Sequence, residues 1–372
     1  MSVYSFIYPM LSGLSGLRGL AALIVVYYHL SQHRTTVWLS PLSWDIYQFT
    51  EHLVFVVSVF FILSGFFRSL SYLKKLEKNE KVPEFFPSLK DRFLRIAPSY
   101  YLALIVSLIY VVYMSGLTWE IVVRLFSGVL FLNWVSVATF FPVDHNWPLW
   151  FVAYDMLGWI LVSVFMMVVA RVGKRYFFFL FAVTCGILLL GHYGWISLPW
   201  WHAEWVAGMW FPTYNPLLFG LHFMLGVLGG YIVTHIKNKS ILYDALSLGI
   251  IALLGYFLWD IRASDDWSYS WPVWPYHFPL VPVLIMGLVI ALPFTRYIWR
   301  ILDNRFLVFY SGISYALYLF HALIIVLLRQ YVFQGVQLDM DVWIWFSLVV
   351  LVLSTALAYT LTKWYEPRFG RR

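Results

Sequence analysis

GLSGLRGLAALIVVYYHL, residues 13–30, is an apolar run long enough to enter a lipid bilayer. It carries one arginine, Arg18, and one histidine, His29. These positions lie about three helical turns apart, so both side chains face almost the same way, about 16 Å apart along the axis. Ionisable residues in membrane helices usually face the protein interior or a water-filled cavity. The pattern predicts a basic group near one membrane surface and a titratable group deep inside; alternatively, Arg18 reaches a lipid headgroup and His29 caps the helix end.

The composition excludes an ordinary soluble domain. The 372-residue chain is 62% hydrophobic, 21% aromatic and 12% charged, whereas about a quarter of the residues in soluble domains are charged. We expect an all-α, polytopic membrane helix bundle, a single domain over residues 1–372 with no appended soluble domain. The net charge of +7 is not read as nucleic-acid affinity, because its distribution fits a membrane surface.

About ten membrane-spanning helices are predicted from the apolar runs. They cover residues 14–32, 53–72, 94–114, 147–170, 176–193, 214–236, 241–260, 278–295, 306–328 and 342–364. The first run lacks a basic region before it and a cleavage site after it, so we expect it to be retained rather than removed as a signal peptide. Cys185, the single cysteine, lies in a predicted span and is expected to serve packing.

The orientation follows from the basic residues. Most of the 25 Lys and Arg fall in 74–95, 171–175, 237–239, 296–305 and 363–372, which the positive-inside rule places in the cytoplasm. This requires an even number of crossings between clusters, so the eleventh apolar stretch, 119–140, is predicted to be a re-entrant or interfacial segment. Both termini are then cytoplasmic. The outer connections 33–52, 194–213 and 261–277 are rich in Trp, Tyr and Pro, which fits either an interfacial aromatic belt or a sugar-binding rim.

Four local patterns occur in a fixed order. They are Arg18 with His29, FFILSGF at 60–66, DRFLRIAPSYY at 91–101 and SYALYLFH at 314–321. Weaker ones are PLW at 148–150 followed by Asp155, and YEP at 365–367. Together, from about residue 12 to 369, they resemble the acyltransferase-3 family of integral-membrane acyltransferases. The chain has Ser15 where that family commonly has Asp, and Asp155 where many members have Glu.

The resemblance implies transfer of an acyl group, usually acetyl, from cytoplasmic acetyl-CoA to a sugar hydroxyl. The implied acceptor is a cell-surface polysaccharide or its lipid-linked precursor, and the implied location is a bacterial inner membrane. Acetyl-CoA would be a substrate, so no bound cofactor is expected. No metal site is predicted, because the ten histidines are dispersed and no metal-binding motif occurs. A succinyl or other acyl donor, or a small-molecule acceptor, remains an alternative.

Three arginines are candidates for donor binding. Arg92 and Arg95 lie three residues apart and so occupy neighbouring positions on one helix face, and a guanidinium can grip a phosphate through two hydrogen bonds. Arg18 is the better candidate because it shares the His29 face. Alternatively, Arg92 and Arg95 are an ordinary positive-inside anchor.

His29 and Asp155 are the catalytic candidates. A neutral imidazole suits a general base acting on a hydroxyl near neutral pH, although it can also accept the acyl group as a nucleophile. Asp155 is expected at a similar depth, where it would hold the other imidazole nitrogen; alternatively it is a satisfied polar residue of the bundle.

Trp150, Tyr318 and His321 are expected to line an acceptor cavity. Tyr318 lies one turn from His321 on the same helix face, while the simpler reading makes His321 a hydrogen-bonded core histidine. The rival class is a transporter or flippase of a lipid-linked sugar, which would have the same spans. Such proteins often contain internal repeats, and no clear repeat occurs here.

Overall fold

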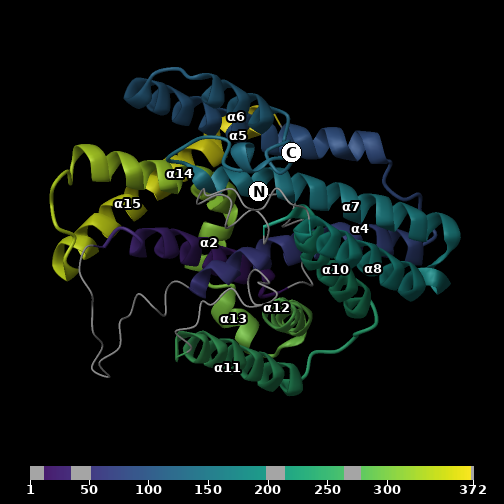
Figure 1. Ribbon diagram of the computed structural model, residues 1–372. Helices are drawn as coiled ribbons and strands as arrows, with labels where there is room; N and C mark the ends of the chain where they lie inside the picture. Colours follow the sequence, from purple (N-terminus) through teal and green to yellow (C-terminus); the bar gives the residue numbers. More distant parts are fainter. Residues whose placement is uncertain (1–11, 35–51, 198–213, 264–277, 370–372) are drawn as a thin grey trace.

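The computed structural model describes residues 12–34, 52–197, 214–263 and 278–369, and these form helices and loops without a strand (Figure 1). The predicted all-α class is thereby confirmed. The α-helices are α2 (Leu14–Ser31), α4 (Val57–Glu77), α5 (Phe85–Ser115), α6 (Trp119–Val129), α7 (Trp150–Val172), α8 (Phe177–Ile196), α10 (Pro216–Val233), α11 (Ile241–Ala263), α12 (Leu280–Ala291), α13 (Ile298–Leu302), α14 (Arg305–Tyr331) and α15 (Met340–Thr360). Short 3-10 turns precede α4 (His52–Val56) and α7 (Trp147–Leu149), and a π-turn (Leu361–Tyr365) follows α15.

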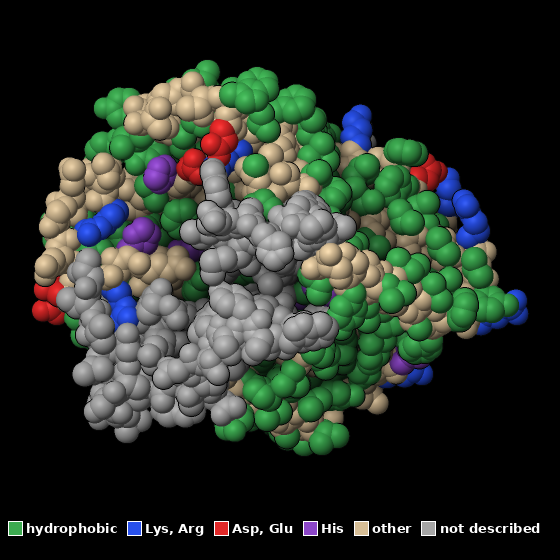
Figure 2. Space-filling model, in the orientation of Figure 1, with side chains coloured by type: hydrophobic (Ala, Val, Ile, Leu, Met, Phe, Trp, Pro, Cys, Tyr) green, Lys and Arg blue, Asp and Glu red, His purple; other side chains and the backbone are tan. Residues whose placement is uncertain are grey.

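Eight described helices are long and apolar enough to cross a membrane. Two shorter apolar helices, Ile241–Phe257 and Leu280–Phe294, complete the ten predicted segments. Hydrophobic side chains cover much of the described surface, and a group of Lys and Arg lies at its right-hand end (Figure 2). The chain is therefore a polytopic helical membrane protein. The three predicted aromatic connections fall almost wholly outside the described residues.

The third predicted span begins earlier than its apolar run. Helix α5 starts at Phe85 and has 31 residues, whereas hydropathy places the start at residue 94. Hydropathy marks only the part of a helix that sits among apolar atoms, and backbone hydrogen bonding continues beyond it. Arg92 and Arg95 therefore lie about two and three turns inside a helix rather than at its beginning.

The predicted re-entrant or interfacial segment, 119–140, has two different halves. Its first half is α6, whose side chains are mostly exposed and whose N-terminus is capped by Thr118, which accepts from the Ile121 N–H at 3.3 Å. After α6 the chain enters the bundle, where Asn133 and Asn146 are fully buried. The irregular chain after α6 thus continues beyond residue 140, the predicted end, as far as the 3-10 turn at Trp147–Leu149.

Helix α2 lies between two hydrophobic cores. Its Leu17, Ala21 and Val25 pack in a core with α4, α7, α10 and α12. Its Ala22 and Val26 pack in a second core with α5, α14 and α15. A helix buried on several sides in this way holds its polar side chains inside the protein, which is the condition the Arg18–His29 stripe requires.

The glycines of the GLSGLRGL stretch allow α2 to approach the start of α14 closely. A Cβ atom on Gly16 would lie 1.9 Å from the Leu302 carbonyl oxygen, and one on Gly19 would lie 2.0 Å from that of Leu307. At the same end, the Asp303 carboxylate accepts from the Gly13 N–H at 2.6 Å and the Gly16 N–H at 2.9 Å. An acidic group at this position satisfies N–H groups that the helix itself leaves open.

Helices α4 and α10 are also in backbone contact. A Cβ atom on Gly65 would lie 2.2 Å from the Phe223 carbonyl oxygen, and one on Gly226 would lie 2.1 Å from that of Ile62. Close contacts of this kind are typical of small residues in membrane helices.

Candidate functional site

His29 lies in the last turn of α2 and is held through one ring nitrogen. Its Nδ1 lies 3.0 Å from the Val25 carbonyl oxygen and 2.9 Å from Nε2 of His321 on α14. His321 is fully buried, and its own Nδ1 lies 2.8 Å from the Tyr318 carbonyl oxygen and 3.1 Å from that of Leu317. The two histidines therefore form a pair with its far end fixed to the backbone of α14.

The carbonyl partners decide where the protons lie. A carbonyl oxygen only accepts, so Nδ1 of His321 carries hydrogen and donates it. In a neutral ring the His321 Nε2 is then an acceptor, and His29 donates from Nδ1 to it and to Val25. The remaining nitrogen of His29, Nε2, makes no hydrogen bond within the described part of the chain. This arrangement leaves a basic lone pair on Nε2, as a general base requires.

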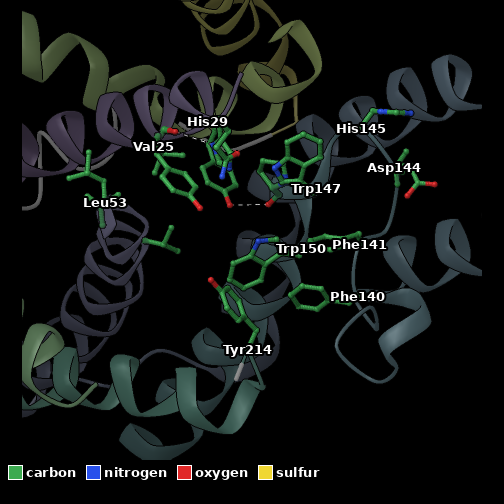
Figure 3. Close-up of a pocket in the computed structure, with 17 residues that line it drawn as sticks. Val25, His29, Leu53, Phe140, Phe141, Asp144, His145, Trp147, Trp150 and Tyr214 are labelled. Carbon is green, nitrogen blue, oxygen red and sulfur yellow. Dashed lines mark hydrogen bonds between the residues drawn. The ribbon is translucent and has the colours of Figure 1, made fainter. Parts of the chain in front are cut away.

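The His29 ring borders a cavity of about 350 Å³. Figure 3 shows His29 and Trp147 on one side of this cavity and Trp150 and Tyr214 across from them, while Asp144 and His145 lie farther out. Trp150 and Tyr318, two of the three residues predicted to line an acceptor cavity, line this cavity. His321 does not line it: it lies behind His29 and supports that ring. The lining is mainly aromatic and aliphatic, with few polar groups, which is the usual make-up of a small-ligand site.

The residues before α7 form one wall of the cavity and are tied to α14. Asn146, fully buried, donates from Nδ2 to the Leu319 carbonyl oxygen at 3.0 Å and to the Ser107 hydroxyl at 2.9 Å. The Tyr318 hydroxyl donates to the Pro148 carbonyl oxygen at 2.9 Å. These bonds involve the turn of α14 just before His321, so the same helix that supports the imidazole pair also positions the cavity wall.

Asp155 lies elsewhere, and the predicted contact between Asp155 and His29 is wrong. The Asp155 carboxylate forms an ion pair with the Arg92 guanidinium of α5, and both side chains are largely buried. No hydrogen bond joins Asp155 to His29 among the described residues. The prediction assumed that α7 begins at a membrane surface. Its first turn is instead buried, and Asn146 just before it bonds to Leu319 in the middle of α14. Asp155 therefore reaches the opposite end of the polar interior.

The three predicted donor-binding arginines have different surroundings. Arg92 is paired with Asp155, whereas Arg95 is exposed and forms no hydrogen bond or ion pair with described residues. Arg18 is partly buried and interacts electrostatically with Glu366, whose carboxylate also accepts from the Ser99 hydroxyl at 3.0 Å. The C-terminal YEP segment thus lies against α5 and near Arg18.

Sequence reasoning missed Arg68 on α4, which interacts electrostatically with Arg92 and Arg95. It also missed Trp147 and Tyr214 in the cavity wall. For Arg68 a signal was present, because an arginine inside a predicted span is costly unless it has a role. For Tyr214 there was no signal, because the chain has many aromatic residues and nothing local distinguishes the one that lines the cavity.

Comparisons with known proteins identify the family of this chain. A search of curated proteins and a search of solved structures each found no match. The family model described as an acyltransferase domain matches residues 11–363, nearly the whole chain. That match includes the imidazole pair, the cavity wall and the arginines, and the chain belongs to the acyltransferase-3 family.

Proposed function

We propose that the protein is an O-acyltransferase in which His29 is the general base. The observation that carries this proposal is the pair of histidines: Nδ1 of His29 is held by Val25 and His321, which leaves Nε2 for the reaction at the edge of the cavity. A base whose second nitrogen is fixed by a hydrogen bond has a defined tautomer and orientation, as in other acyl-transferring enzymes.

In the proposed step, Nε2 of His29 takes the proton of an acceptor hydroxyl. The hydroxyl oxygen then attacks the thioester carbonyl carbon, and an ester bond forms as the carbon–sulfur bond breaks. The thiolate leaves with the proton that His29 had taken, so the imidazole returns to its neutral state. While His29 is positively charged, its Nδ1–H donates to the Val25 carbonyl oxygen and to His321, which lowers the energy of that state.

The donor is proposed to be acetyl-CoA, entering from the cytoplasm near Arg18, Arg92 and Arg95. The phosphates of CoA need cationic partners, and guanidinium groups bind phosphate through paired hydrogen bonds. Arg18 lies about three turns from His29 on one face of α2, so a long thioester arm is the kind of ligand that can reach both. We accordingly propose that both chain termini are cytoplasmic, as the distribution of basic residues favours, and that the protein lies in a bacterial inner membrane.

The acceptor is proposed to be a sugar hydroxyl of a cell-surface polysaccharide or of its lipid-linked precursor. Trp147, Trp150 and Tyr214 present flat aromatic rings to the cavity, and such rings pack against the C–H faces of sugars. Oxygen and nitrogen groups at the farther edge, on Asp144 and His145, are suited to hydroxyl contacts.

The test compares cells that carry the wild-type protein, His29→Ala or His235→Ala, the last a control because His235 is exposed and remote from the cavity. Acyl groups on the surface glycans are measured by mass spectrometry, and transfer from labelled acetyl-CoA is measured in membranes. Loss of a general base lowers the rate by about 10²–10⁴-fold, so we expect His29→Ala to abolish detectable acylation and His235→Ala to leave it unchanged.

Three outcomes would contradict parts of this proposal. If no glycan acyl group depends on the wild-type protein, the polysaccharide acceptor is wrong. If label enters only with succinyl-CoA, the acetyl donor is wrong. If a correctly folded His29→Ala protein acylates at the wild-type rate, or if an acyl group is trapped on His29 itself during turnover, the general-base role is wrong.

A further inference from the structure

Arg68 on α4 is a partly buried arginine whose partners are all neutral. Its Nε donates to the Ser163 hydroxyl at 2.9 Å, and its Nη2 donates to the Tyr72 hydroxyl at 3.0 Å. The guanidinium also lies over the Trp159 ring, 4.1 Å from its centre. Within the described residues no carboxylate pairs with it, although buried arginines are normally paired with an acid.

Helix α7 holds Arg68 beside Arg92. Asp155 pairs with Arg92, and the Trp159 ring lies under Arg68. These two residues are four apart on α7 and are therefore neighbours on one face. Ser163, another Arg68 partner, follows one turn later on the same face. Side chains on successive turns of α7 thus hold the guanidinium groups of Arg92 and Arg68.

Positive charge is in excess in this region. Arg68 interacts electrostatically with both Arg92 and Arg95, and Asp155 is the carboxylate paired with this group of three. Like charges are brought together at a cost, which an anionic ligand would offset. The third nitrogen of Arg68, Nη1, makes no hydrogen bond in the described part of the chain, so the side chain can bind such a ligand without releasing its present partners.

We propose that Arg68 is a further donor-binding residue and that its Nη1 edge binds a phosphate group of CoA beside Arg92. This inference rests on the proposed use of an acyl-CoA donor. Ser163 and Tyr72 hold the guanidinium through two of its nitrogens and Trp159 supports its face, so the side chain is oriented before the ligand arrives. Such preorganisation lowers the entropic cost of binding.

The experiment measures binding of CoA, 3′-dephospho-CoA and pantetheine to the purified full-length protein in lipid nanodiscs by calorimetry. The variants are Arg68→Gln, Arg68→Lys and a control, Arg171→Gln. Arg171 lies exposed in the last turn of α7 and is not among the arginines that interact with Arg68. Thermal unfolding of each variant reports whether it is folded, and Arg68→Lys retains the charge if Arg68→Gln does not fold.

We expect Arg68→Gln to weaken CoA binding about tenfold or more, because a hydrogen bond to a charged group contributes about 1.5–3 kcal/mol. Pantetheine, which has no nucleotide phosphates, should bind to the variant and the wild type equally, and Arg171→Gln should resemble the wild type. If the loss disappears with 3′-dephospho-CoA, the contact is to the 3′-phosphate. If it persists, the contact is to the diphosphate.

The proposal is overturned if Arg68→Gln binds CoA as tightly as the wild type, or if CoA and pantetheine lose affinity equally, which would indicate a structural role. If the wild type itself binds no form of CoA, the proposed function fails together with the inference. Wild-type binding with no effect of Arg68 refutes the inference alone.

Discussion

The two ends of the polar interior are stabilised in opposite ways. At one end, His29 and His321 form a chain of hydrogen bonds that terminates on backbone carbonyls. At the other end, Arg68 and Arg95 bring further positive charge near the ion pair of Arg92 with Asp155. The histidine end is complete without a ligand, whereas the arginine end has a surplus of charge that a ligand can neutralise. The difference fits a base that must be ready before substrates arrive and a site that binds a polyanion.

The largest expected effect concerns His321, which tests whether the histidine end is preorganised. His321→Ala removes the partner of His29 Nδ1, so His29 loses its fixed tautomer and orientation. We expect kcat to fall about 100-fold with little change in the KM for acetyl-CoA, as measured by acetyl transfer in membranes. His321→Gln, which offers a side-chain oxygen to Nδ1 of His29, should recover part of the rate.

A merely structural role for His321 would give a different result. In that case the Ala and Gln variants would lose rate only in proportion to their loss of folded protein, measured by thermal unfolding. An unchanged kcat in folded His321→Ala would show that His29 does not depend on this contact.

A smaller effect is expected from the packing of α2 on α14. In Gly16→Ala the added Cβ meets the carbonyl oxygen of Leu302, the last residue of α13, and relief requires α2 to move away from the connection that leads into α14. Overpacking of this kind costs about 1–3 kcal/mol, which we expect as a lower midpoint of chemical or thermal unfolding. Gly312→Ala on α14 is the matched control, because no atom lies within 4 Å of the position of its Cβ. Equal stability of the two variants would contradict the close contact.

The smallest expected effect on catalysis concerns Asp155, which tests whether the two ends are separate. Asp155→Asn removes the charge paired with Arg92 but leaves His29 and His321 in contact. We therefore expect kcat to stay within about threefold of wild type, while the KM for acetyl-CoA changes, because Arg92 is no longer held by a carboxylate. Steady-state kinetics with varied donor concentration measures both. A loss of kcat by about 10⁴ would instead indicate the orienting role of a catalytic-triad aspartate.

The sequence predicted the positions of the helices better than the depth of single residues within the bundle. Apolar runs located the eight described helices that are long and apolar enough to cross a membrane, and two shorter apolar helices as well, because hydropathy over such a length is a strong signal. The stripe of Arg18 and His29 was readable because helical geometry alone places both on one face. The contact of His29 with His321 joins α2 to α14, and no local pattern specifies which of several buried polar groups will meet across such a distance in sequence.

The error on Asp155 has a specific cause. Its depth was estimated from its distance to the start of a span, which assumes that the span begins at the membrane surface. Residues 130–149 instead enter the bundle, where Asn133 and Asn146 are buried. The depth of Asp155 was therefore counted from the wrong starting point. Arg68 was overlooked for the opposite reason: its position in a span was visible, but its neutral partners Tyr72, Ser163 and Trp159 became known only with the packing of α4 on α7.

Asp303 has a mechanical consequence for the whole first helix. It fixes the start of α2 beside α14 through two backbone N–H groups, and His29 meets α14 again about 20 Å farther along the axis. Because α2 is held at two separated points, it cannot slide along α14 or rotate about its own axis relative to α14. The orientation of His29 Nε2 thus depends on contacts at the opposite end of α2. A substitution at Asp303 would displace His29 although Asp303 does not contact it.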